Sequence, residues 1–154
     1  MANTSLTRGI SSAGSETKGT FSAWVKRTKL GDYHKMYTSY QASNEFLDVQ
    51  FNNADQLAVT LLIGGSTFLD LRTTRLFRDP SAWYHIVVAI DSTDSTQADR
   101  CKVYVNGVRE TSFATNTNNM SADLNCRING TAQTVYVGSW HNADYFDGCM
   151  SHVH

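Results

Sequence analysis

The chain consists of short runs in which every second residue is apolar, and this period of two restricts most of it to strands. Phe21, Ala23 and Val25 alternate with side chains of the opposite face, as in a strand with one buried face. Similar runs cover residues 34–40, 45–51, 57–63, 67–73, 84–90, 102–105, 108–113 and 134–138. No stretch keeps a helical period, and only three glutamates and five lysines are present to occupy solvent-facing helix positions. We predict an all-β protein with about nine strands.

Turn signals separate several of these runs and indicate how the strands connect. Asn106-Gly107 supplies two residues that accept a positive φ, which a type I′ hairpin turn requires. Gly64-Gly65 predicts a second hairpin between two alternating runs. Strands at this spacing favour a two-sheet antiparallel β-sandwich.

Composition excludes several classes of function. The formal net charge is −1, 18% of the residues are charged, and no block of Lys or Arg occurs, which argues against nucleic acid as a partner. The longest apolar stretch, residues 57–65, is interrupted by Thr60 and is far shorter than the roughly 20 residues of a membrane helix. We therefore expect no membrane span. The N-terminus has no basic region followed by an apolar one, so we also expect no secretory signal.

The three cysteines, Cys101, Cys126 and Cys149, are widely spaced. Their spacing matches neither a zinc site nor a CxxC redox pair. We expect reduced thiols, and the alternative is one disulfide with a thiol left over.

Five motifs carry a resemblance to a known family. They are, in order, FSAWVKR from Phe21, WYHIVVAID from Trp83, KVYVNGV from Lys102, VYVG from Val135 and YFDGCM from Tyr145. This series resembles the laminin-G-like branch of the concanavalin A-like jelly rolls, especially the versions found in bacteriophage structural proteins. The resemblance covers nearly all of residues 20–154, and residues 1–19 form an extended lead-in with at most one short edge strand. It implies two curved antiparallel sheets and a mostly non-catalytic role in glycan binding, adhesion or virion architecture.

The ends of the chain depart from the family pattern. The phage-type domains usually begin with a strand before the position of Leu6 and continue past the equivalent of Val153-His154. The resemblance therefore predicts either a fragment or sheet edges that another chain completes, because an unpaired edge is a template for association. We expect a homo-oligomer or a component repeated in a particle, with sister virion subunits as partners.

Most residues of these motifs have a structural interpretation. We predict that Ile86, Val88 and Ile90 fill the space between the sheets and that Trp24 and Trp83 are core or corner residues, since large rings bury the most area. His85 lies inside the same run as the three aliphatic residues, so we expect it to form a structural hydrogen bond.

The sequence does not predict a catalytic residue. Glycoside hydrolases with this fold need two carboxylates that converge on one sugar bond. The nearest pair is Glu45 and Asp48, whose spacing places them on opposite faces of a strand. No G-x-S-x-G elbow is present. We predict that the protein is not an enzyme, and a polysaccharide-cleaving enzyme is the weaker alternative.

Calcium is the cation that this fold family most often binds, and one loop has suitable oxygen atoms. Asp91, Asp94 and Asp99 are separated by hydroxyl residues, a chemistry that suits a hard cation. A solvated loop that uses Asp and Ser for its turns explains the pattern equally well. Asp144 and Asp147 form a second cluster of this kind. We commit to no metal or other cofactor.

Glycan binding requires exposed rings that stack on sugar faces, with polar groups beside them. Two segments supply both, and their candidate residues are Trp140, His141, Asn142, Asp144 and Tyr145 in one and Tyr33 and His34 in the other. The first is preferred because Trp140 follows the end of a strand, where loops carry function on a rigid scaffold. The alternative is that Trp140 and Tyr145 only cover the edge of the sandwich.

Three arginines, Arg72, Arg75 and Arg78, are spaced three apart. They form either a cationic patch for an acidic partner or an ordinary solvated face, and we favour the second interpretation.

These observations lead to one preferred function. We expect a non-enzymatic module of a phage tail, fibre or capsid that binds a surface glycan. It would be assembled in the host cytoplasm and released with the virion, which fits the missing signal sequence and the unpaired thiols. The alternative is a purely architectural subunit that assembles through its sheet edges and binds no sugar.

Overall fold

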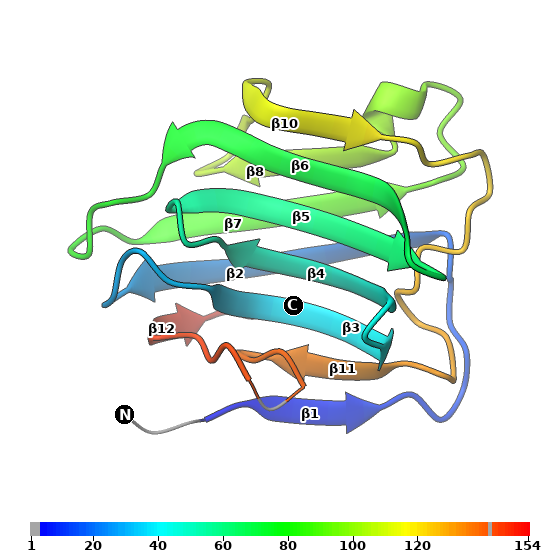
Figure 1. Cartoon of the computed structure of the whole chain (residues 1–154), viewed down its shortest axis with the longest axis horizontal. Coiled ribbons are helices and arrows are strands. Elements are labelled where there is room, and N and C mark those ends of the chain that lie inside the picture. Colours follow the sequence, from blue (N-terminus) through cyan, green and yellow to red (C-terminus); the bar gives the residue numbers. More distant parts are fainter. Residues whose placement is uncertain (1–3, 142) are drawn as a thin grey trace.

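Two antiparallel sheets pack face to face in the computed structural model, which describes residues 4–141 and 143–154 (Figure 1). The seven-stranded sheet contains, in spatial order, β1 (Leu6–Gly9), β11 (Thr134–Val137), β3 (His34–Ala42), β4 (Glu45–Phe51), β5 (Gln56–Ile63), β6 (Ser66–Leu76) and β10 (Phe113–Asn118). The five-stranded sheet contains β12 (Gly148–Ser151), β2 (Lys18–Arg27), β7 (Tyr84–Asp91), β8 (Cys101–Val105) and β9 (Val108–Arg109). One short 3₁₀ turn, Gln97–Asp99, precedes β8. The predicted all-β sandwich is confirmed.

Both predicted hairpins are present. Asn106 and Gly107 have φ values of 52° and 79° and join β8 to β9, and Gly64 and Gly65 have φ values of 57° and 82° and join β5 to β6. These positive φ values match a type I′ turn, whose twist suits the flanking strands. The predicted short edge strand of the lead-in is β1, which pairs with β11.

One predicted strand, residues 108–113, is wrong. The chain leaves the five-stranded sheet after Arg109, and Phe113 begins β10, which pairs with β6 at the edge of the other sheet. A crossing between sheets has no signature in local alternation, because each half keeps its own period of two. The part of the chain that the structure describes contains no long apolar helix of the kind that crosses a membrane.

The core lies between the two sheets and is built from alternate residues of their strands. Ile86, Val88 and Ile90 are buried there as predicted. The seven-stranded sheet contributes Met36, Leu47, Val49, Phe51, Leu57, Val59, Leu61, Leu69 and Leu71.

The prediction that Trp24 and Trp83 are core or corner residues is wrong. Their side chains are 41% and 42% exposed. Ala23 and Val25 occupy the inward positions of β2 at 0% exposure, so the alternation turns Trp24 outward. The large size of the Trp24 ring favoured burial, but the alternation of side chains along β2 places this ring on the outward face.

The three cysteines are free thiols, as their spacing predicts. Cys101 and Cys126 are buried, and burial raises their pKa values to about 12 and about 11. Cys149 is exposed on β12. The two buried thiols are therefore protonated and unreactive at neutral pH.

A buried arginine links the two sheets at one end of the sandwich. Arg27 is the last residue of β2 and is 0% exposed. Its Nη2 donates to Asp55 Oδ1 at 2.9 Å, and its Nη1 donates to the Phe77 carbonyl at 2.8 Å. The guanidinium lies 4.7 Å from the centroid of the Phe51 ring. All three partners belong to the side of the seven-stranded sheet.

Asp55 neutralises Arg27 and gathers further donors. It lies in the turn before β5 with a φ of 63° and accepts hydrogen bonds from the Gly31 amide at 2.8 Å and from Arg78 Nε at 3.0 Å. Burial alone would raise the pKa of Asp55, but these hydrogen bonds and the one from Arg27 hold it below its usual value. The carboxylate is therefore charged whenever the protein is folded near neutral pH.

We predict that Asp55→Asn lowers the free energy of unfolding by about 3 kcal/mol near neutral pH, because it leaves Arg27 buried without its counter-charge. A carboxyl whose pKa is lowered in the folded state stabilises the fold above its unfolded pKa, and this contribution is lost as pH falls through the folded pKa. The difference between wild type and variant should therefore shrink below about pH 4.

Urea unfolding of both proteins at neutral and acid pH measures this. Asp32→Asn is the matched control, since Asp32 pairs with Lys29 at the surface and exposed pairs contribute little to stability. A loss of stability in Asp55→Asn no larger than in the control would contradict the prediction.

Candidate functional site

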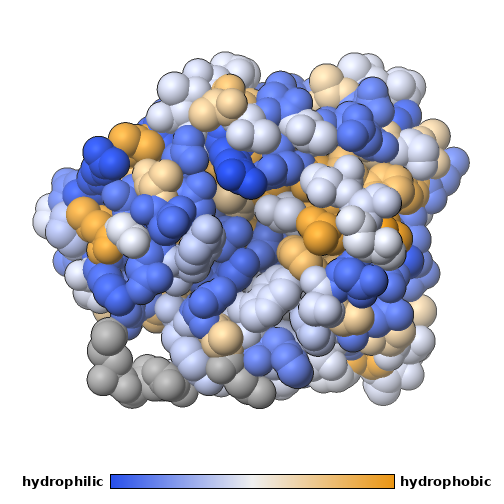
Figure 2. Space-filling view, in the orientation of Figure 1, coloured by the Kyte–Doolittle hydropathy of each residue, from blue (hydrophilic) through white to orange (hydrophobic). Residues whose placement is uncertain are grey.

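The outward face of the seven-stranded sheet carries a row of polar side chains. Leu47 and Val49 point into the core, so Asp48 between them points outward. The strand register places Thr38 beside Asp48, Asp48 beside Thr60, and Thr60 beside Asp70. These four residues, from β3, β4, β5 and β6, are called the polar row. Figure 2 shows this face, whose centre is largely hydrophilic with separate hydrophobic patches.

An ion pair lies at the centre of this row. Lys35 Nζ donates to Asp48 Oδ2, and the two side chains are only 8% and 1% exposed. Burial raises the pKa of Asp48, and the neighbouring Lys35 opposes that shift. The pair is thus shielded from solvent although it lies on an outward face.

Several buried polar atoms on this face lack a hydrogen-bond partner among the described residues. They are Thr38 Oγ1, Asp48 Oδ1 and Gln50 Oε1. Gln50 lies on β4 opposite Lys35. Buried polar groups are normally paired with protein, water or ligand, so this face has unused capacity for hydrogen bonds.

Aromatic rings flank one end of the polar row. We call Tyr40, Phe46, Tyr136, Trp140 and His141 the aromatic wall. Trp140 meets the Phe46 ring edge to face with centroids 4.3 Å apart, and His141 stacks on Tyr40 at 4.6 Å with an interplanar angle of 9°. Lys35 Nζ lies 4.6 Å from the centroid of the Trp140 ring. The ion pair and the wall are therefore in direct contact through Lys35.

The loop that carries Trp140 is held by backbone contacts to the sheet. Trp140 N donates to the Ala143 carbonyl at 2.7 Å, which closes a narrow turn. Lys35 N donates to the Asp144 carbonyl at 3.3 Å, and Asp147 N donates to His34 Nδ1 at 3.0 Å. In Figure 1 this segment, in orange and red, leaves the end of β11 and passes below β3 toward β12. The two segments predicted as glycan-binding candidates therefore lie side by side.

The predicted glycan-binding residues have different environments. His141 and Asp144 are exposed, Trp140 and Tyr145 are half-buried, and Tyr33 is 42% exposed.

The predicted ligand contact His34 is buried instead of exposed. His34 is 1% exposed, and its ring holds the loop through Asp147 and meets Phe146 edge to face at 6.0 Å. Burial lowers the pKa of His34, and the positive charge of Arg27 adds to this. Its ring is therefore neutral and turned away from solvent. Asn142 lies outside the described residues.

The polar row was not predicted from the sequence. Its members are far apart in the chain, and only the hairpin registers bring them together. The signal that could have found them is a Thr or Asp at an outward position near the middle of four successive strands, at residues 38, 48, 60 and 70. Glu45 forms a separate ion pair with Arg127 at 2.5 Å.

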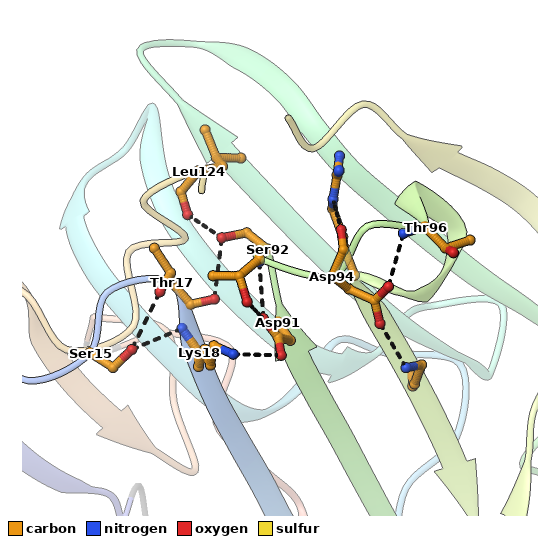
Figure 3. A network of polar contacts seen from close by, with 11 residues as sticks. Ser15, Thr17, Lys18, Asp91, Ser92, Asp94, Thr96 and Leu124 are labelled. Atoms are coloured by element: carbon orange, nitrogen blue, oxygen red, sulfur yellow. Dashed lines mark hydrogen bonds and ion pairs between the residues drawn. The ribbon is translucent and has the colours of Figure 1, made fainter. Parts of the chain in front are cut away.

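The predicted calcium loop is held together by cations of the protein itself (Figure 3). Asp91 accepts from Lys18 Nζ at 3.0 Å, and Asp94 accepts from Lys102 Nζ at 3.2 Å. Asp99 pairs with Arg109. Within residues 4–141 and 143–154, no three His, Cys, Asp or Glu side chains are grouped as metal ligands. Calcium at Asp91, Asp94 and Asp99 stays a prediction that no contact in the structure favours.

The arginines at 72, 75 and 78 each pair with a carboxylate. Arg72 binds Asp70 through two hydrogen bonds of 2.9 Å. Arg75 lies 3.3 Å from Glu110, and Arg78 lies 3.0 Å from Asp55. The three guanidinium groups are already neutralised, so they do not form an unpaired cationic patch.

Comparison with known proteins gives a family and several structural neighbours. A family model described as the concanavalin A-like lectin/glucanases superfamily matches residues 3–154. No curated protein sequence matches the chain.

Solved structures share the fold at low identity. Domains LG4-5 of the mouse laminin alpha1 chain match with a TM-score of 0.65 and 11% identity over 98% of this chain and 38% of that one. The heptameric SAP-like pentraxin from Limulus polyphemus matches at 0.60 and 15%, over 96% and 67%. The CBM40 of the Ruminococcus gnavus IT-sialidase, bound to alpha2,3 sialyllactose, matches at 0.57 and 13%, over 89% and 72%. The chain thus spans well under half of the laminin structure.

We predict that Lys35→Met destabilises the protein in a pH-dependent manner. Without its cation, buried Asp48 must take up a proton or remain charged in an apolar site, at a cost of about 3 kcal/mol. A carboxyl whose pKa is raised in the folded state destabilises the fold increasingly as pH rises through that pKa. The variant should therefore lose more stability relative to wild type at about pH 8 than at about pH 5.

Urea unfolding at both pH values tests this, with Lys102→Met as the control because Lys102 is paired with Asp94 nearer the surface. An equal loss at both pH values would show that Asp48 does not respond to Lys35.

Proposed function

Because the chain belongs to the concanavalin A-like lectin/glucanases superfamily, we propose that it is a non-catalytic carbohydrate-binding domain. The ligand lies on the outward face of the seven-stranded sheet, between the aromatic wall and the polar row. The R. gnavus CBM40, a carbohydrate complex with this fold, supports the choice of ligand class.

The observation that carries this proposal is that a fixed aromatic group and unpaired hydrogen-bonding atoms occur on the same face of one sheet. Trp140 is held by Phe46 and Lys35, and Thr38 Oγ1 and Asp48 Oδ1, which are buried on the same face, have no hydrogen-bond partner among the described residues. A sugar ring presents C–H bonds on one side and hydroxyls around its rim, so it needs an apolar platform beside polar groups. Among the described residues, Lys35 and Arg72 on this face are already paired with carboxylates, which favours a neutral sugar over an acidic one.

The carboxylates of the polar row support binding rather than hydrolysis. Asp48 and Asp70 lie two strands apart, roughly 9.5 Å by strand spacing, which is within the range of inverting glycosidases. Asp48 is held by Lys35 and Asp70 by both nitrogens of the Arg72 fork. Each carboxylate is thus held in an ion pair within the protein, which favours a binding role over hydrolysis.

The domain is also proposed to be a repeated component of a phage particle. The order of its motifs, which resembles phage structural proteins, supports this. The edge strand β1 also supports it, since all four of its residues are exposed, and Leu6 is 71% exposed. An exposed edge with an apolar side chain is suited to pairing with a sister subunit. In the architectural alternative, this edge would be the whole function and no sugar would bind.

We predict that Trp140→Ala abolishes binding on a glycan array and that Thr60→Val, which has nearly the same shape, weakens it about tenfold by removing one hydroxyl partner. Val108→Ala is the matched control, because Val108 is 65% exposed on β9, far from this face.

Thermal melting of each variant establishes that the fold is intact. If folded wild-type protein binds no glycan on the array, the proposal fails, and if Thr60→Val binds as wild type does, the polar row is not part of the site.

We predict that the protein self-associates as its concentration rises and that Leu6→Glu, which places a charge on the β1 edge, weakens this association at least tenfold. Light scattering over a concentration series measures it. A monomer at every concentration would argue strongly against assembly through this edge.

A further inference from the structure

The outward face of the five-stranded sheet carries a second aromatic recess. Trp24 of β2 and Trp83, the residue before β7, line a hollow of about 390 Å³ together with Ser151 and His152. Among the described residues these are two of eight exposed large hydrophobic side chains, and they share one recess. The depression is shallow and open to solvent, so a ligand would lie on the indoles and not be enclosed by them.

One of the two indoles is fixed from behind. Trp24 stacks on His85 with ring centroids 5.0 Å apart and an interplanar angle of 21°. His85 Nε2 is in turn 3.0 Å from Ser22 Oγ, the structural hydrogen bond that the sequence predicts. The Trp24 ring is thus supported on one face and 41% exposed overall. Such a ring loses little conformational freedom when a ligand stacks on it.

The rim of the recess supplies hydrogen-bonding groups. Ser151 Oγ and His152 Nδ1 are 2.8 Å apart, so His152 Nε2 is the ring atom that can meet a ligand. His152 has a φ of 50°, an uncommon conformation for a residue other than glycine. This conformation sets the ring at the end of β12, beside the indoles.

The size of the apolar area decides between a protein and a small ligand. A stable protein interface buries about 800 Å² on each partner, whereas four residues line this recess. Lys26 is two residues after Trp24 on β2 and therefore lies on the same outward face. It places a positive charge at the border of the recess. The recess therefore suits a compact ligand with an apolar face and a polar edge.

We propose that this recess is a second carbohydrate site, which takes β-linked pyranose sugars whose ring substituents are equatorial. Such rings expose flat C–H faces that stack on indoles, and their hydroxyls project sideways toward Ser151 and His152. This site is independent of the polar row, because it lies on the other sheet and shares no residue with it.

The chain contains three tryptophans in all, so the indole signal of each one can be followed separately. In the Trp140→Phe variant the only indole signals are those of Trp24 and Trp83, so an NMR titration with cellopentaose observes the recess alone. We expect both signals to shift and saturate with a Kd of about 1 mM. His152→Ala should weaken this binding about tenfold, and Trp83→Ala should abolish it.

Leu76→Ala is the matched control, since Leu76 is 43% exposed at the end of β6 on the other sheet. The site is disproved if neither indole signal shifts with cellopentaose in the folded Trp140→Phe protein. It is equally disproved if light scattering shows a dimer that Trp83→Ala dissociates, because the recess would then be a protein contact. If the Trp24 and Trp83 signals of the wild-type protein shift with cellopentaose and the Trp140 signal does not, this site stands independently of the first one, which the glycan array tests.

Discussion

The burial of one charged side chain, Arg27, determines how the rest of this sandwich is arranged. A guanidinium at 0% exposure requires a counter-charge beside it, because a buried charge without one is strongly destabilising. Asp55 provides the counter-charge. Its Oδ1 accepts hydrogen bonds both from Arg27 and from the Gly31 amide, so it also fixes the backbone at Gly31. The turns before β3 and β5 are therefore fixed relative to β2, and the two sheets are held in register at this end.

The candidate site depends on the same end of the molecule through a short series of contacts. β3 begins at His34, next to the fixed turn, and His34 and Lys35 hold the loop of Trp140 through Asp147 and Asp144. Lys35 then joins Asp48 to the Trp140 ring. The loop of Trp140 is thus attached to the start of β3, beside the fixed turn, which is the arrangement expected of a preformed binding site.

The sequence predicted the local features of the fold and few of the features that depend on register. Asn106-Gly107 and Gly64-Gly65 were predictable because their φ values are a property of the turn itself. The outward direction of Trp24 also follows from the alternation of Phe21, Ala23 and Val25 on the buried face, but the size of the indole ring was given more weight than this period. The same limit applies to the site. The ring of Trp140 follows a strand and could be named in advance, whereas Thr60 and Asp70 become neighbours only through the pairing of β5 with β6. His34 has the residue type of a ligand contact, but its depth in the fold cannot be read from its neighbours in sequence.

The way in which Trp140 is held has a consequence for the thermodynamics of recognition. Free aromatic and lysine side chains lose rotamer entropy when a ligand orders them, at a cost of about 0.5 to 1.5 kcal/mol each. Here Trp140 and Lys35 are already ordered by each other and by Phe46 and Asp48. Binding at this face would therefore show a small entropic penalty from the protein, and its enthalpy would report mainly on the exchange of water for sugar hydroxyls.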